Sequence, residues 1–140
     1  MDALLQSQVL GRIGCHAEGR TYVVPVTYAY TGKHIICHSR EGLKLQMMRQ
    51  NPDVCFEVDH VVNMANWQSV ILQGRFEELE GLAAEEALGQ LMSRVLPLLV
   101  SETAHPHEPV SSPERGRTGS TGATLFRIRI REKTGRFEKQ

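Results

Sequence analysis

The residues with the clearest potential for chemistry lie in Ile35–Lys44, where the sequence reads IICHSREGLK. An apolar run is followed by a hydroxyl, basic side chains and a glycine, as where a strand ends and a helix begins. Free N–H groups at the helix start, the Ser39 hydroxyl and the charges of Arg40 and Lys44 could bind a phosphate, and Gly42 would let the backbone approach it. An ordinary capped helix with basic residues in its first turns shows the same spacing, so both interpretations are open.

A second feature is Pro25, which lies inside the strand-like segment Thr21–Tyr30 (TYVVPVTYAY). That segment is rich in β-branched and aromatic residues, which favour strands. Because proline has no N–H group to donate to a ladder, Pro25 predicts a sheet edge or a bulge. Backbone groups beside it would then be free to hydrogen-bond to a ligand.

The three cysteines, Cys15, Cys37 and Cys55, lie in segments expected to be strands and show no CxxC spacing. We interpret them as buried free thiols, which are typical of a reducing compartment. A cysteine beside a histidine, as in Cys15-His16 and Cys37-His38, could act as a nucleophile, but the buried thiol is the commoner case.

Metal binding is not expected, because the histidines lack ligand spacing and the pair His105-x-His107 lies in a loop-like segment. The arginines of the last strand-like segment, Arg127, Arg129 and Arg131, indicate either a solvated face or the border of a bound anion. No acid–base pair in the sequence compels a particular reaction, so the catalytic residues stay unassigned.

Composition narrows the class of protein. The chain has 140 residues, 41% of them hydrophobic, which is enough for one core and one domain. Its 16 basic and 16 acidic residues balance, which argues against bulk binding to nucleic acid or to an anionic membrane. Without a long apolar run or a basic-then-apolar N-terminal segment, a soluble cytoplasmic protein is expected.

Periodicity and turn signals place the elements that would position these residues. Strands are predicted over Val9–His16, Thr21–Tyr30, His34–His38, Asp53–Asp59, Trp67–Glu80 and Thr124–Glu132. Helices are predicted over Met1–Gln8, Glu41–Gln50 and Ala83–Leu99, and Pro97 should kink or end the last one. The segments between and after them are predicted to be a loop at Val61–Asn66, a mobile or functional connection at 101–123 and a polar tail at Lys133–Gln140.

The phase of the long strand changes near its end, because Leu79 does not share the face of Val70, Leu72 and Phe76. A bulge or bend is therefore predicted between Gly74 and Leu79. Hairpin-paired strands with helices at the rim predict a mainly β protein, an antiparallel barrel in a single domain of residues 1–140.

Six motifs, in this order, resemble the pyridoxamine 5'-phosphate oxidase-like proteins, and among them the nitroimidazole-resistance-type flavoproteins. They are GRIG at Gly11–Gly14, YVVPVTYAY at Tyr22–Tyr30, HSREGLK at His38–Lys44, NPDVCFEVD at Asn51–Asp59, WQSVILQG at Trp67–Gly74 and TGR at Thr134–Arg136. The resemblance covers Val9–Arg136 apart from 101–123. It implies a six-stranded antiparallel Greek-key split β-barrel of the FMN-binding type, with two or three helices.

The resemblance also implies a homodimer with FMN in the grooves between subunits. The Pro-containing strand, with Val24, Pro25, Val26 and Thr27, would lie along the flavin ring and offer backbone hydrogen bonds. Ser39 and Lys44 would hold the phosphate, with Arg40 or His38 close by. Trp67, Gln68 and Ser69 would come from the long strand and reach the flavin of the other subunit.

The function expected from this likeness is that of an FMN-dependent oxidoreductase with an unidentified small-molecule substrate or an electron donor such as NAD(P)H. In such proteins the flavin carries the redox chemistry. A non-catalytic flavin or haem carrier is the alternative, and a deazaflavin could replace FMN on this fold. True pyridoxamine 5'-phosphate oxidases supply a substrate pocket from a C-terminal motif with arginine and tryptophan, whereas LFRIRIREKTGRFEKQ here has no tryptophan.

Overall fold

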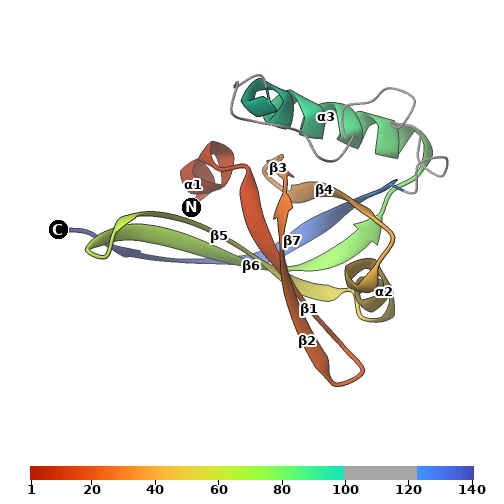
Figure 1. Cartoon of the computed structure of the whole chain (residues 1–140), viewed down its shortest axis with the longest axis horizontal. Helices are drawn as coiled ribbons and strands as arrows, with labels where there is room; N and C mark the ends of the chain where they lie inside the picture. Colours follow the sequence, from red (N-terminus) through yellow and green to blue (C-terminus); the bar gives the residue numbers. More distant parts are fainter. Residues whose placement is uncertain (100–122) are drawn as a thin grey trace.

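The computed structural model describes residues 1–99 and 123–140, which form one curved sheet with three helices (Figure 1). The strands are β1 (Leu10–Ala17), β2 (Arg20–Thr27), β3 (Ala29–Tyr30), β4 (His34–Arg40), β5 (Asp53–Asn63), β6 (Asn66–Glu78) and β7 (Ala123–Glu138). The helices are α1 (Asp2–Ser7), α2 (Leu43–Gln50) and α3 (Gly81–Leu99). The connection predicted over 101–123 lies outside the described residues, except that Ala123 begins β7.

All strand pairs are antiparallel, and their order across the sheet is β2-β1-β5-β6-β7-β4-β3. The two edge strands, β2 and β3, follow one another in the chain and are separated only by Tyr28. The sheet therefore curls until its first and last strands meet at this residue. Tyr28 is fully buried, and its hydroxyl donates a 2.8 Å hydrogen bond to the carbonyl oxygen of Leu5 in α1. The predicted mainly β antiparallel fold is confirmed.

The described residues form seven strands where six were predicted, because the segment Thr21–Tyr30 divides at Tyr28. Its first part pairs with β1, whereas Ala29 and Tyr30 pair with β4 across the Gly32 turn. A sequence with uniform strand propensity does not show where a strand changes partner, since β propensity reflects packing rather than position in a sheet.

The long ribbon of β5, β6 and β7 extends further than predicted, to the far end of the molecule in Figure 1. Val61 pairs with Trp67, which also pairs with Glu138. Most of the predicted loop at Val61–Asn66 therefore belongs to β5 and β6, with the turn at Met64 and Ala65, and the predicted polar tail at Lys133–Gln140 is strand as far as Glu138. Both segments are mostly exposed on two sides, which hides the alternation that identifies a half-buried strand. The bulge occurs between Gln73 and Gly74, just before the predicted stretch.

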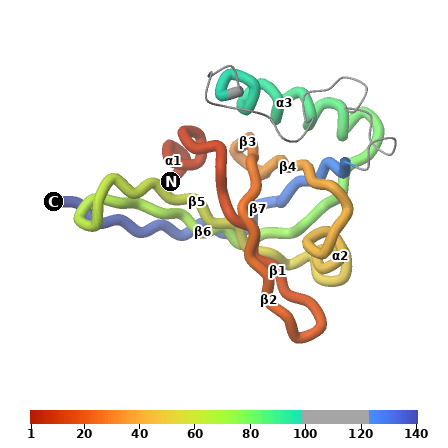
Figure 2. The backbone as a smooth tube through the Cα atoms, in the orientation of Figure 1, coloured from red at the N-terminus to blue at the C-terminus, as the bar shows by residue number. Residues whose placement is uncertain are grey.

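The hydrophobic core fills the inside of the curled sheet, and Figure 2 shows α2 lying across one end of it. Leu45, Met47 and Met48 of α2 are buried in this core. A second, smaller cluster lies on the outside of the sheet, where α3 packs against Ile36 and Leu125. α3 is described as far as Leu99 and runs through Pro97, so it does not end at this proline.

Candidate functional site

The side chains of Ser39 and Lys44 meet where β4 leads into α2. The ammonium group of Lys44 donates a 2.7 Å hydrogen bond to the Ser39 hydroxyl, which donates in turn to the carbonyl oxygen of Arg40 at 2.9 Å. Lys44 lies in the first turn of α2, where backbone N–H groups have no partner within the helix. A hydroxyl, an ammonium group and a helix N-terminus therefore come together, as the sequence predicted.

Lys44 is half-buried, and its surroundings suit an anionic ligand. Burial lowers the pKa of Lys44 from its ordinary value of 10.5, while the nearby thiols of Cys37 and Cys15 oppose that shift. Within residues 1–99 and 123–140 no carboxylate forms an ion pair with Lys44. A buried cation is stabilised by an opposite charge, so a phosphate here would replace an interaction that the protein does not supply.

His38 and Arg40 lie on the opposite face of β4 from Ser39, since side chains alternate along a strand. Ile36 lies on the same face of β4 as His38 and Arg40, and it packs in the outer cluster with α3. Cys37 lies on the same face as Ser39, and it is part of the core inside the curled sheet. The structure thus groups Ser39 with Lys44 and directs His38 and Arg40 toward the outer face. Gly42 has an ordinary extended φ of 172°, and a side chain there would meet only open space.

The Pro25 segment lies on the edge strand β2, as predicted. Pro25 pairs with Arg12 of β1 on one side, and no described strand pairs with β2 on the other. Val24 and Val26 point toward the core, while Pro25 is exposed on the outer face and Thr27 follows it half-buried. The free backbone groups of this edge are available to a ligand, because every second N–H and C=O group of an edge strand points away from the sheet.

Trp67, Gln68 and Ser69 lie on β6 near the far end of the ribbon, whereas α2 is at the other end of the molecule (Figures 1 and 2). One chain therefore does not bring them to Ser39 and Lys44. Trp67 is half-buried and pairs with Val61 and Glu138, and Ser69 pairs with Asp59 and Arg136.

The thiols are free, as predicted, and Cys15 and Cys37 are buried. Burial raises the pKa of the Cys15 thiol and strongly raises that of Cys37. Because the thiolate is the reactive form, both groups are poor nucleophiles. Cys55 is half-buried beside Gly14, where a side chain would come within 2.7 Å of the Cys55 sulfur. No helix in the described part of the chain is long and apolar enough to cross a bilayer.

Three arginines near the start of β7 are paired with carboxylates. Arg127 and Arg129 both contact Glu77, at 2.8 and 2.6 Å, and Arg131 contacts Asp53 at 2.9 Å. This arrangement agrees with the solvated-face interpretation. Metal-ligand clusters are absent from the described residues, and the pair His105-x-His107 lies outside them.

Sequence reasoning missed a charged cluster on the outer face of the sheet. One amino group of Arg12 contacts Glu57 at 3.1 Å and Asp59 at 3.4 Å. Burial, followed by the neighbouring Asp59, raises the pKa of Glu57. Exposed apolar side chains of the same face surround the cluster: Leu10 is 51%, Val23 61% and Ile71 40% exposed. The cluster depends on the pairing of β1 with β5, which the sequence alone does not give.

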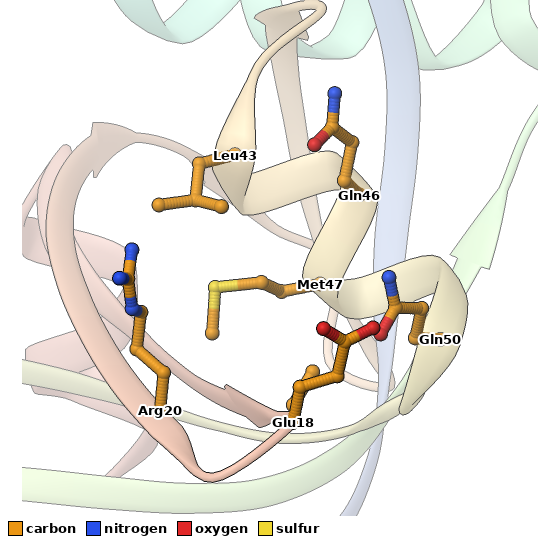
Figure 3. A pocket seen from close by; sticks show the side chains of 7 residues that line it. Glu18, Arg20, Leu43, Gln46, Met47 and Gln50 are labelled. Atoms are coloured by element: carbon orange, nitrogen blue, oxygen red, sulfur yellow. The ribbon is translucent and has the colours of Figure 1, made fainter.

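A pocket of about 320 Å³ between the β1–β2 turn and α2 was also missed (Figure 3). Its lining comes from Ala17, Glu18, Arg20, Leu43, Gln46, Met47 and Gln50. Within the described residues, Glu18 is the one non-glycine residue with a positive φ, 52°, and Gly19 follows with 76°. The Glu-Gly pair between two strand-like segments is the signal that predicts such a turn.

Comparisons with known proteins complete this description. A family described as pyridoxamine 5'-phosphate oxidase matches residues 1–137. An uncharacterised protein of Rhizobium meliloti (strain 1021) is 37% identical over 70 residues, which are 50% of this chain and 46% of that protein. The chain therefore matches about half the length of this curated relative.

Solved structures share the fold. The crystal structure of an FAD-binding protein from Mesorhizobium loti has a TM-score of 0.77 and 27% identity, with 99% of this chain and 91% of that chain covered. A candidate 5-nitroimidazole antibiotic resistance protein from Bacteroides thetaiotaomicron has a TM-score of 0.68 and 20% identity, with 96% and 80% covered. The split-barrel fold and the resemblance inferred from the six motifs are confirmed.

Proposed function

We propose that this chain, which belongs to the pyridoxamine 5'-phosphate oxidase family, is an FMN-binding flavoprotein that acts as an oxidoreductase. The observation that carries the proposal is the contact between Lys44 and Ser39, a half-buried cation and a hydroxyl with no carboxylate from the described residues beside them. A phosphate oxygen can accept hydrogen bonds from both groups and from the first N–H groups of α2.

The chain's own residues would bind and orient the cofactor. Lys44 and Ser39 would hold the phosphate, and the free edge of β2 at Val24–Thr27 would offer backbone donors and acceptors to the flavin ring. His38 and Arg40 would act only from the outer face of β4. The bound flavin would supply the redox chemistry, with its potential tuned by hydrogen bonds and nearby charges.

A second copy of this chain completes the proposed site. Trp67, Gln68 and Ser69 are remote from Lys44 in one chain, yet Ser69 and Trp67 share the outer sheet face with Pro25 and Arg12. The exposed Leu10, Val23 and Ile71 give that face an apolar surface that a partner would cover. In the homodimer that we propose, this face packs against its equivalent, and Trp67–Ser69 approach the partner's flavin.

The cofactor is tested by calorimetric titration of the purified apoprotein with FMN and riboflavin. We expect FMN to bind at least about tenfold more tightly, because the Lys44 and Ser39 contacts require a phosphate. Equal affinity for the two ligands would remove the basis of the proposal. The absorbance spectrum of freshly purified protein distinguishes flavin from deazaflavin or haem.

The dimer is tested by sedimentation at micromolar concentration. We expect the wild-type protein to sediment as a dimer and Ile71→Asp to shift it toward monomer, because a charge would be buried in the interface. Leu82→Asp is the matched control, since Leu82 is an exposed leucine of α3, away from this face. A wild-type monomer that still binds FMN would contradict the shared site.

Turnover is tested by adding NADH or NADPH to the FMN-loaded protein and following oxidation of the donor under air. Oxidation that depends on bound FMN would support an oxidoreductase. Tight FMN binding without any turnover, with either donor, would instead favour a flavin carrier.

A further inference from the structure

The pocket between the β1–β2 turn and α2 combines two opposite charges with an apolar floor. Met47 and Ala17 are buried and Leu43 is 37% exposed, so their side chains form the floor. Glu18 and Arg20 border the open space, and Figure 3 shows their charged groups on different sides of the Met47 side chain. A cavity of about 320 Å³ is at the lower end of the range for ligand pockets, which suits a small molecule.

The two charges do not neutralise each other, although both residues stand on one tight turn. In the part of the chain that the structure describes, neither Glu18 nor Arg20 belongs to an ion pair. By contrast, Arg49 of the same helix α2 contacts two carboxylates. Opposite charges that are held apart across an apolar surface are each left available to a ligand.

The turn that carries the carboxylate is unfavourable for glutamate. Glu18 and Gly19 both have positive φ, which is the geometry of a type I′ hairpin turn. Asn, Asp or Gly fits the first central position of this turn better than glutamate, which has a longer side chain and rarely adopts positive φ. A carboxylate is therefore held at the pocket despite a local conformational cost.

The charges define the class of ligand that the pocket suits. A purely anionic ligand would be repelled by the Glu18 carboxylate, and a purely cationic one by the Arg20 guanidinium group. An α-amino acid carries both charges, but on one carbon, whereas the Met47 side chain separates the charges of the pocket. A carboxylate at one end, an ammonium group at the other and an apolar chain between them match all three parts of the lining.

We propose that this pocket binds an ω-amino carboxylate, as a ligand additional to FMN. The Arg20 guanidinium group donates hydrogen bonds to the ligand's carboxylate, and the Glu18 carboxylate accepts them from its ammonium group. The ligand's methylene chain packs on Met47 and Leu43, which removes apolar surface from water. Gln50 lies on the Glu18 side of the pocket in Figure 3, where its amide oxygen can accept a further hydrogen bond.

The experiment is a titration of the full-length protein with ε-aminocaproate, followed through the backbone amide signals of Glu18–Arg20 and α2 in NMR spectra. Three matched compounds each remove one feature of this probe. Caproate lacks the ammonium group, hexylamine lacks the carboxylate, and norleucine is the isomer with both charges on one carbon. We expect ε-aminocaproate to shift these signals and to bind about threefold to fivefold more tightly than each matched compound, because exposed charge pairs contribute modestly.

Two variants assign the charges to their residues. In Glu18→Asn, which fits the turn better than glutamate, ε-aminocaproate should bind no more tightly than caproate. In Arg20→Gln, it should bind no more tightly than hexylamine. Glu86→Gln on α3 and Arg75→Gln on β6 change exposed charges that do not line the pocket, and they should leave all affinities within about twofold.

Three results would overturn the assignment. Equal affinity for ε-aminocaproate and norleucine would mean that the pocket does not recognise the separation of the charges. A titration without shifts at Glu18–Arg20 and α2 would leave the pocket as a solvated hollow, and a preference that survives in both variants would place the site elsewhere. Lys44 and Ser39 do not line this pocket, so the flavin titrations test the proposed function separately, and either proposal can fail alone.

Discussion

Two cationic regions of this protein differ in how their charges are satisfied. On β7, Arg127 and Arg129 share Glu77, and Arg131 contacts Asp53, all at ion-pair distance. At the start of α2, Lys44 contacts a neutral hydroxyl and is half-buried, whereas Arg129 and Arg131 are exposed. The three arginines are thus already neutralised by carboxylates, and Lys44 is the cation for which we propose an anionic ligand.

The comparison shows why charge counts along a strand are a poor guide to an anion site. Three alternating arginines attract attention in the sequence, but Glu77 on the neighbouring strand β6 and Asp53 on β5 compensate them. Exposed pairs of this kind contribute only about 0–1 kcal/mol to stability and are screened by salt. A half-buried ammonium group with no carboxylate gains more from a ligand, since the ligand restores a charge interaction in a less polar environment.

The largest effect on FMN affinity is expected from removing the two side-chain hydrogen-bond donors, Lys44 and Ser39. Lys44→Ala combined with Ser39→Ala should weaken FMN binding by at least about tenfold, because each charge-assisted hydrogen bond contributes roughly 1.5–3 kcal/mol when well formed. Titration calorimetry measures the affinity, and circular dichroism of the apoprotein checks that the fold persists. Unchanged affinity in a folded double variant would mean that these residues only begin a helix.

A smaller effect on FMN affinity is expected from a change of pH. Because burial lowers the pKa of Lys44, its ammonium group loses its proton at a lower pH than an ordinary lysine. A bound phosphate favours the protonated form, so FMN affinity should be constant near neutral pH and fall as pH rises through the pKa of Lys44 in the free protein. Linkage limits the fall to about tenfold per pH unit.

Titrations of FMN between pH 7 and pH 10 measure this dependence, with riboflavin as the control for ionisation of the flavin ring. Lys44→Arg should keep its charge over the whole range and abolish the fall. A fall of the same size for riboflavin would assign it to another group.

The sequence predicted the local parts of the site better than their assembly. The strand-to-helix step at Ser39–Lys44 and the edge position of Pro25 follow from residue type alone, since a proline without N–H cannot sit in a central strand. The alternation along β4 could also have placed His38 and Arg40 opposite Ser39. To assign the two faces, one must know that Cys37 faces the inner core and Ile36 the outer cluster. Both residues are apolar, so the sequence does not distinguish them.

Long-range features were beyond the sequence. The division of one strand at Tyr28 depends on which neighbour each half meets as the sheet curls. The extension of β5 through Val61 and of β7 through Glu138 depends on mutual pairing of exposed strands rather than on burial. The Arg12–Glu57–Asp59 cluster joins residues on separate strands, so spacing within either strand does not reveal it.

Removing one of the paired arginines of β7 should have little effect on either stability or FMN affinity, in contrast to removing Lys44. Arg129→Ala breaks one exposed ion pair, while Arg127 still neutralises Glu77, so we expect a loss of less than about 1 kcal/mol of unfolding free energy. FMN affinity should stay within about twofold, in contrast to the Lys44 variant. Chemical denaturation and flavin titration measure the two quantities. An affinity loss comparable to that of Lys44→Ala would show that β7 borders the cofactor after all.

The smallest effect, no detectable activity, is expected when FMN-loaded protein is given pyridoxamine 5'-phosphate under air. Oxidation of that substrate requires a second phosphate site that holds a substrate carbon against the flavin. Arg127, Arg129 and Arg131 of β7 are engaged by Glu77 and Asp53, and the segment lacks the tryptophan of the family's C-terminal motif. A phosphate bound there would have to compete with these carboxylates, in a salt-sensitive and loosely oriented way. Absorbance of pyridoxal phosphate measures the product, with free FMN as the blank. Robust turnover that disappears in Arg129→Ala would show that Arg129 leaves Glu77 to bind the substrate phosphate. The arginines of β7, and not only Lys44, would then form an anion site.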